Sequence, residues 1–141
     1  MEGRATGIEM WGNFQASEKW RLSAGMTALH ERFTLKPESI ETSNVVAASG
    51  RDPTYTAMLR SSFDIDPRNE FDLMIRRVAK LSSPEVPAYT AVDMRYAWTP
   101  RKNLELSITG RDLFGSHAEF SPSATRSSFG RGILLKLVAG F

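Results

Sequence analysis

Alternation of apolar and polar residues is the feature of this sequence that most limits its fold. Seven stretches alternate with a period of two residues, at 7–16, 20–31, 55–65, 70–81, 89–99, 104–111 and 132–141. Because successive side chains of a β-strand point to opposite sides, this period predicts strands with one apolar and one polar face. Almost no stretch has helical spacing, so we predict an all-β chain.

The composition excludes most kinds of catalytic and metal-binding site. The chain has 141 residues, which is one domain or one piece of a larger protein, and it has no cysteine. Disulfides, thiolate nucleophiles and zinc–thiolate sites are therefore excluded, and the two histidines, His30 and His117, are far apart. We predict no enzymatic activity, no metal and no cofactor. The 18 basic residues are nearly balanced by 16 acidic ones and form no run longer than two, so we expect no nucleic-acid partner.

The connections between the stretches alternate between short and long. Short polar turns lie at 17–19, 66–69 and 100–103, and longer connections lie at 36–53, 82–87 and 115–129. Outer-membrane β-barrels have this asymmetry, with tight periplasmic turns and longer extracellular loops. Each stretch is also close to the ~9–11 residues that a tilted strand needs to cross a bilayer. The pattern predicts an antiparallel up-and-down meander of about seven strands in sequence order.

The two faces of these strands differ in a way that suits a membrane barrel. Aromatic residues on the apolar faces lie near the short turns, and rings of this kind favour the membrane–water interface. The predicted periplasmic aromatic belt consists of Phe14, Trp20, Phe63, Phe71, Tyr96 and Trp98. The polar faces carry charges that a wet lumen would accommodate, and we expect most of them to pair across neighbouring strands. The predicted lumen-facing charges are Glu70, Asp72, Arg76, Asp93, Arg95, Glu105 and Arg111.

A soluble fold is the alternative to a membrane barrel. Alternation is equally compatible with a small soluble β-barrel that binds an apolar small ligand inside it. Such a carrier would need an apolar interior and a charged exterior, whereas the charged faces here suit a wet interior. We therefore prefer the membrane barrel.

Three segments resemble the C-terminal part of TonB-dependent outer-membrane receptors. They are Val86-Pro87-Ala88-Tyr89-Thr90-Ala91-Val92-Asp93-Met94-Arg95-Tyr96, then Trp98-Thr99-Pro100-Arg101-Lys102-Asn103-Leu104-Glu105-Leu106-Ser107, then Gly110-Arg111-Asp112-Leu113-Phe114-Gly115. In the family a proline–aromatic strand entry, a tight turn, "N-L-E-L-S" and an Asn-Leu-Phe-Asp element follow in this order. Asp112 stands here for the usual Asn and Gly115 for the usual Asp, without a change of register.

The resemblance implies a partial barrel wall. Barrels of this family have 22 strands and enclose a plug domain, and neither the plug nor the energy-coupling box is present in this sequence. Residues 1–141 are therefore expected to be the C-terminal segment of a receptor barrel. The intact protein would lie in the outer membrane of a Gram-negative bacterium. It would import a scarce nutrient, such as a ferric siderophore, haem or cobalamin, with energy from the TonB complex through the missing plug.

The last strand carries a further expected signal. A terminal aromatic residue with apolar residues at alternate positions before it resembles the signal that the barrel-assembly machinery recognises. The residues of this barrel-assembly signal are Phe141, Ala139, Leu137, Leu135 and Ile133. The expected partners are therefore outer-membrane lipid, the assembly machinery, the TonB complex and an iron chelate or similar ligand.

Overall fold

One antiparallel sheet contains nearly all the regular structure. The computed structural model describes residues 2–34, 50–119 and 123–140. Its sheet has seven strands in sequence order, which are β1 (Glu2–Ser17), β2 (Trp20–Thr34), β3 (Tyr55–Asp66), β4 (Asn69–Val78), β7 (Tyr89–Arg101), β8 (Leu104–Arg111) and β11 (Gly132–Ala139). Every neighbouring pair is antiparallel. The predicted all-β meander is confirmed.

The long connections contain small elements that periodicity did not predict. β5 (Leu81–Ser82) pairs with β6 (Glu85–Val86), and β9 (His117–Ala118) pairs with β10 (Ser128–Phe129). A 3-10 turn, η1 (Ser123–Thr125), precedes β10. The stretch predicted at 70–81 is accordingly divided, because β4 ends at Val78 and Leu81 belongs to β5.

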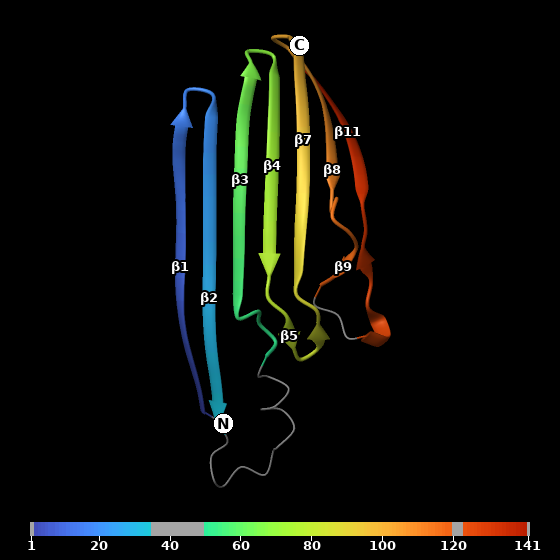
Figure 1. The fold of residues 1–141 in the computed structure, drawn as a ribbon. Helices are drawn as coiled ribbons and strands as arrows, with labels where there is room; N and C mark the ends of the chain where they lie inside the picture. Colours follow the sequence, from blue (N-terminus) through green and yellow to red (C-terminus); the bar gives the residue numbers. More distant parts are fainter. Residues whose placement is uncertain (1, 35–49, 120–122, 141) are drawn as a thin grey trace.

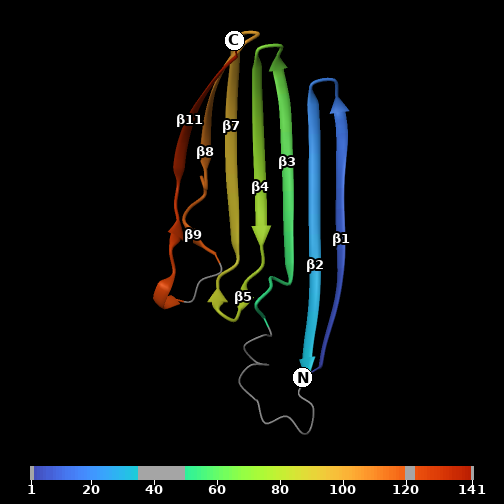
Figure 2. The same ribbon diagram turned by 180° about the vertical axis from the view of Figure 1, so that it is seen from behind.

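The sheet has two distinct ends and a curved surface. The tight turns of β1–β2, β3–β4 and β7–β8 lie together at the end that we call the turn end, and the longer connections lie at the opposite loop end (Figure 1). The central strands are nearest the viewer in Figure 1, and Figure 2 shows the sheet from behind. The predicted alternation of short and long connections is present.

Turn chemistry fixes how the strands pair. The Asp66 carboxylate accepts a hydrogen bond from the backbone N–H of Arg68 at 2.8 Å and from the side-chain amide of Asn69 at 2.7 Å. Local hydrogen bonds of this kind to an aspartate are typical of tight turns. The bond from the Arg68 N–H, and after it the bond from the Asn69 amide, lowers the pKa of Asp66. The turn brings Phe63 opposite Phe71, and the period of two carries this register along both strands.

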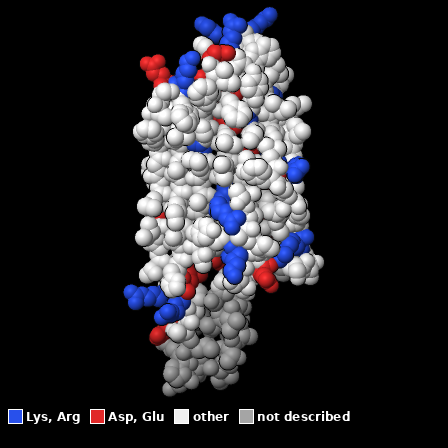
Figure 3. Space-filling model, in the orientation of Figure 1, with Lys and Arg blue, Asp and Glu red and all other residues white. Residues whose placement is uncertain are grey.

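The register divides the side chains between two faces. We call the face that carries Tyr96 the outer face and the face that carries Arg95 the inner face. Apolar residues fill most outer positions, for example Ile108, which is opposite both Tyr96 and Leu135. On the outer side shown in Figure 3, lysine, arginine, aspartate and glutamate gather toward the two ends, and the band between them is largely white.

The buried core is small because the sheet is a single layer. Among the described residues the buried apolar side chains are Ala79, Leu81, Val86, Ala91, Val92 and Ala97. Large outer-face residues stay open to solvent, with Ile8 at 66% exposure and Leu135 at 75%. A sheet face of this kind is normally covered by a second layer of structure or by lipid.

Candidate functional site

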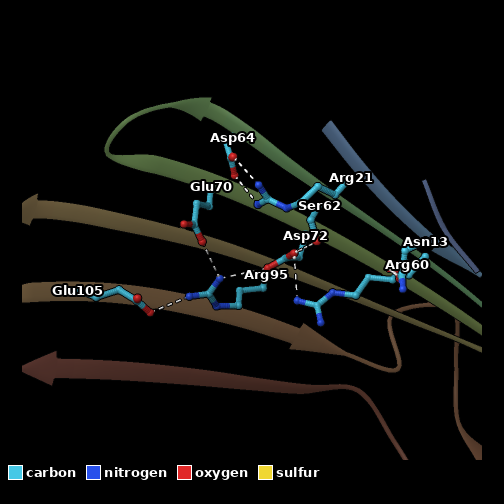
Figure 4. Close-up of polar contacts among 10 residues, drawn as sticks. Asn13, Arg21, Arg60, Ser62, Asp64, Glu70, Asp72, Arg95 and Glu105 are labelled. Atoms are coloured by element: carbon cyan, nitrogen blue, oxygen red, sulfur yellow. Dashed lines mark hydrogen bonds and ion pairs between the residues drawn. The ribbon is translucent and has the colours of Figure 1, made fainter. Parts of the chain in front are cut away.

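A network of charged side chains crosses the inner face near the turn end. We call it the polar wall, and it consists of Arg21, Arg60, Asp64, Glu70, Asp72, Arg95 and Glu105, with Ser62 as a neutral member (Figure 4). Its members come from the five neighbouring strands β2, β3, β4, β7 and β8. The register explains their meeting, because Ser62 is opposite Asp72 and Asp72 is opposite Arg95.

Arg95 is the centre of the polar wall. Its guanidinium lies 2.6 Å from a carboxylate oxygen of Glu105, 3.1 Å from Asp72 and 3.4 Å from Glu70. Asp72 also accepts hydrogen bonds from the Ser62 hydroxyl at 2.5 Å and from Arg60 at 3.3 Å. An arginine presents several donors in a planar fork, so one side chain can join three strands.

A second pair extends the wall toward β1. Arg21 and Asp64 form a bidentate pair with nitrogen–oxygen distances of 2.8 and 2.7 Å. The sequence prediction did not place Arg21, Arg60 or Asp64 among the candidate residues, although all three alternate onto the same face as Arg95. The signal that identifies them is diagonal proximity once the strands are paired, because Asp64 is two positions from Ser62, the residue opposite Arg21, and Arg60 is two positions from Ser62, the residue opposite Asp72.

The polar wall is suited to stabilising the inner face of the sheet and to keeping that face hydrated. Each carboxylate in it is bonded to arginine, and no serine or cysteine lies beside a free base in these contacts. Paired charges of this kind stabilise neighbouring strands and leave hydrophilic atoms for a water-filled space. The arrangement therefore resembles the inner wall of a channel more than a catalytic cleft.

A compact cluster holds the last long connection against the sheet at the loop end. The His117 ring stacks on Tyr89 with a centroid distance of 4.0 Å and lies 5.8 Å from the Phe129 ring. Glu119 accepts a hydrogen bond from the Tyr89 hydroxyl at 2.8 Å and lies 2.9 Å from His117 Nε2. Burial raises the pKa of Glu119, but the bonds from His117 and Tyr89 lower it more, so the pKa lies below its usual value.

The remaining predicted lumen-facing residues lie beside this cluster. The Asp93 carboxylate accepts a hydrogen bond from the backbone N–H of Asp112 at 3.0 Å. The backbone of Asp112 is in the left-handed region, with a φ of 52°. Arg76, Asp93 and Arg111 line a cavity of about 380 Å³ together with His117. The Nε of Arg76 is buried without a hydrogen-bond partner among the described residues. Thus the predicted charges form two groups, and the structure does not bring all seven together.

The predicted aromatic belt residues occupy the outer face near the turn end. Four of them form one row across neighbouring strands, because Phe63 is opposite both Trp20 and Phe71, and Phe71 is opposite Tyr96. Trp98 is two positions nearer the turn on β7. Phe14 is opposite Leu22, one outer position farther from the turn than Trp20.

The apolar positions of the predicted assembly signal lie on one side of β11. Ile133, Leu135 and Leu137 are opposite Gly110, Ile108 and Leu106 on the outer face, and Ala139 is opposite Leu104. These three large side chains are exposed at 64% or more. Phe141 lies outside the described residues.

Neither a metal cluster nor a membrane-crossing helix is found in the described part of the chain. Residues 2–34, 50–119 and 123–140 include no group of three or more histidine or acidic side chains that is arranged to hold a metal ion. The same residues contain no helix with the length and apolar character needed to span a membrane.

A curved meander with one apolar and one ion-paired face defines a class of structure, the wall of a large β-barrel. No protein-family model and no curated protein matches the chain in sequence. Among solved structures, the chain is similar to the siderophore receptor PiuA from Acinetobacter baumannii, with a TM-score of 0.78. The sequences are 20% identical, and the match covers 97% of this chain but 22% of the receptor chain.

The match concerns the fold. At this identity, the shared feature is the arrangement of the strands over almost the whole chain, and it agrees with the resemblance to TonB-dependent receptors seen in the sequence. The chain spans about a fifth of the length of the receptor that it matches.

Proposed function

We propose that residues 1–141 are the C-terminal wall segment of an outer-membrane receptor barrel. The observation that carries this proposal is the division of one single-layered sheet into an exposed apolar outer face and an ion-paired inner face. Lipid would cover the outer face, and the polar wall would face the lumen. The outer edges of β1 and β11, which are the two ends of the sheet in the described part of the chain, would then pair with the other strands of the complete barrel.

The intact protein, in this proposal, imports a scarce nutrient across the outer membrane of a Gram-negative bacterium. The similarity to a siderophore receptor favours a ferric siderophore, with haem and cobalamin as the other members of the nutrient class. Energy would come from the TonB complex through a plug domain. The segment itself supplies wall and loops and performs no chemistry.

The soluble-carrier alternative requires the opposite distribution of side chains. A soluble barrel of this size would bury its apolar face and turn its charges outward. Here the curved sheet carries its ion pairs on the inner face, and residues such as Ile133, 78% exposed, remain uncovered on the outer face. These positions favour the membrane proposal.

Three tryptophans offer a direct test of which face meets lipid. Trp20 and Trp98 lie on the outer face, whereas Trp11 alternates onto the inner face opposite Gly25 and is 79% exposed. We would prepare three single-tryptophan variants by changing the other two tryptophans to phenylalanine. Each would be reconstituted in vesicles that contain brominated lipid, which quenches tryptophan on contact.

The proposal predicts quenching of Trp20 and Trp98 by brominated lipid and quenching of Trp11 by a water-soluble quencher such as iodide. The Trp11 variant is the matched control, because it shares the strand pair of Trp20. Equal access of iodide to all three tryptophans, together with a monodisperse monomer in plain buffer, would contradict the proposal and favour the soluble carrier.

A further inference from the structure

The imidazole ring in the loop-end cluster lies between two carboxylates. The His117 side chain on β9 is 6% exposed, and the rings of Tyr89 and Phe129 lie against it. Its Nε2 lies 2.9 Å from a carboxylate oxygen of Glu119, and its Nδ1 lies 3.7 Å from Oδ1 of Asp112. The second distance is too long for a hydrogen bond. Nδ1 and Oδ1 are both buried, and neither has a hydrogen-bond partner in the described part of the chain.

The bonds around Glu119 determine which nitrogen of the neutral ring carries the proton. Burial raises the pKa of Glu119, but the bonds from His117 and Tyr89 lower it more, so the carboxylate is ionised at neutral pH. An ionised carboxylate only accepts hydrogen bonds, so the proton of the neutral ring lies on Nε2. Nδ1 then presents a lone pair to the Asp112 carboxylate. The two buried atoms therefore face each other as acceptors without a donor between them.

A second proton on the ring would supply the missing donor. At Nδ1 it would convert the contact with Asp112 into a charge-assisted hydrogen bond, which requires an approach from 3.7 Å to about 2.8 Å. Histidine is the side chain that takes up a proton just below neutral pH. The charged ring would also lie over the Tyr89 ring, at a centroid distance of 4.0 Å, where the aromatic face attracts a cation. Proton uptake would therefore bind the ring more firmly to both neighbours.

Charged groups from other elements face the same space. They are Arg76 on β4, Asp93 on β7, Arg111 on β8 and Arg126, which precedes β10. The Arg126 guanidinium donates to the backbone carbonyl of Glu85. The arginines disfavour a charged ring and the carboxylates favour it. Asp112 and Glu119 face the two ring nitrogens directly, and charge interactions are strongest at such short distances. The charges in contact with the ring nitrogens are thus the ones that a protonated ring would pair with.

Asp112 connects this contact to the main sheet. Its backbone N–H donates to the Asp93 carboxylate, and the N–H of Leu113 donates to the Val92 carbonyl at 2.9 Å. Both acceptors belong to β7. β9, in contrast, pairs with β10 in a separate two-stranded sheet. A bond from His117 to Asp112 would therefore tie the outlying β9 to a part of the chain that is fixed on the seven-stranded sheet.

We propose that His117, Asp112 and Glu119 form a clamp that holds β9 on the main sheet and tightens when the ring is protonated. In mild acid the ring bonds both carboxylates, whereas at neutral pH the bond to Asp112 is absent and β9 opens more readily. The clamp does not require lipid on the outer face, so it goes beyond the proposed function and is tested separately from it. In the proposed receptor β9 lies on the extracellular side, and its opening would depend on the acidity of the medium.

Hydrogen–deuterium exchange of the full chain in detergent, at about pH 7.5 and about pH 5.5, tests the clamp. Both values lie above 4.5, the ordinary pKa of Glu119, so this carboxylate stays ionised. The quantity compared is the protection factor of the β9 amides. The test variants are Asp112→Asn, which removes the charge but tolerates the left-handed φ, and His117→Gln, which removes the titrating ring. The matched control is His30→Gln, because His30 is the second of the two histidines in the chain.

The protection factor of the unmodified chain should rise about fivefold from the neutral to the acidic sample, somewhat below the factor of about ten for a fully buried hydrogen bond between charged groups. His30→Gln should show the same rise, and His117→Gln should lose it. Asp112→Asn should also lose the rise but keep the neutral protection, because the asparagine amide can donate to the bare Nδ1. Absence of the rise in the unmodified chain, its persistence in either test variant, or its loss in His30→Gln would overturn the inference. Each comparison is made between two pH values of one variant, so a general loss of stability does not imitate the expected result.

Discussion

Replacement of Arg95 by methionine should weaken the sheet more than any other single change in the polar wall. Methionine keeps most of the aliphatic stem and removes the guanidinium that contacts Asp72, Glu70 and Glu105. Asp72, whose side chain is 14% exposed, would retain Ser62 and the longer contact to Arg60. The variant therefore leaves a largely covered carboxylate without its main counter-charge.

The magnitude follows from the exposure of the partners. Exposed ion pairs contribute about 0.2–1 kcal/mol, whereas breaking a fully buried pair costs about 3–5 kcal/mol. The Arg95 side chain is 29% exposed, and its contact to Glu70 is long and open to solvent, so solvent screening reduces the upper figure. We expect a loss of about 2 kcal/mol for Arg95→Met. The control Arg21→Met, whose ion pair with Asp64 is open to solvent at 48% exposure of the arginine, should cost clearly less.

Urea unfolding in detergent, followed by tryptophan fluorescence, measures this difference without adding salt that would screen the charges. A double-mutant cycle strengthens the result. Arg95→Met combined with Asp72→Asn should be less destabilised than the sum of the two single variants, because the second change removes the isolated charge. Equal losses for Arg95→Met and Arg21→Met, or strict additivity in the cycle, would refute the reasoning.

Three further predictions concern the aromatic row and the loop end. Phe71→Ala should lower the free energy of unfolding by about 1 kcal/mol in the same assay, because the ring lies between Phe63 and Tyr96. Asp112→Ala should cost about 1–2 kcal/mol and Asp112→Asn much less, because asparagine tolerates the left-handed φ; equal costs would contradict this reason. The pKa of Glu119 is lowered in the folded protein, so its ionised carboxylate stabilises the cluster that it forms with His117 and Tyr89. This contribution is fully present above pH 4.5, the ordinary pKa of the group, and is lost as the pH falls through the folded-state pKa. The protection factor of the β9 amides, which is corrected for the intrinsic pH dependence of amide exchange, should therefore fall in acid below pH 4.5, and this fall should be absent in Glu119→Gln.

The sheet order and the two faces could be predicted from the sequence because both depend on local information. A period of two residues assigns each side chain to a face, and a tight turn fixes which strand follows which. The strands at 7–16 and 20–31 nevertheless extend farther in the structure, to Glu2 and Thr34. At 2–6 the polar residues Glu2, Arg4 and Thr6 lie on the face that is apolar from Ile8 onward, so the apolar face of the pattern does not continue, yet the backbones still pair.

Contacts between distant segments could not be predicted in the same way. The role of Arg95 as the centre of three ion pairs depends on which carboxylates of the two neighbouring strands lie within its reach, and this requires the register of β4, β7 and β8 together. The stacking of His117 on Tyr89 joins a loop to a strand, and no local pattern indicates such a contact. The short strands β5, β6, β9 and β10 have two residues each, too few to show a period.

The one-to-one register of the central strands limits how this chain can change in length during evolution. From Thr56 to Asp64, each residue of β3 has one partner on β4 without a bulge. One inserted codon in the middle of β4 would turn every later side chain of that strand to the other face, so Ile75 would lie on the inner face and Arg76 on the outer face. Single-residue insertions and deletions should therefore accumulate in the long connections and be rare between Phe71 and Ile75, whereas substitutions that preserve polarity should be common there.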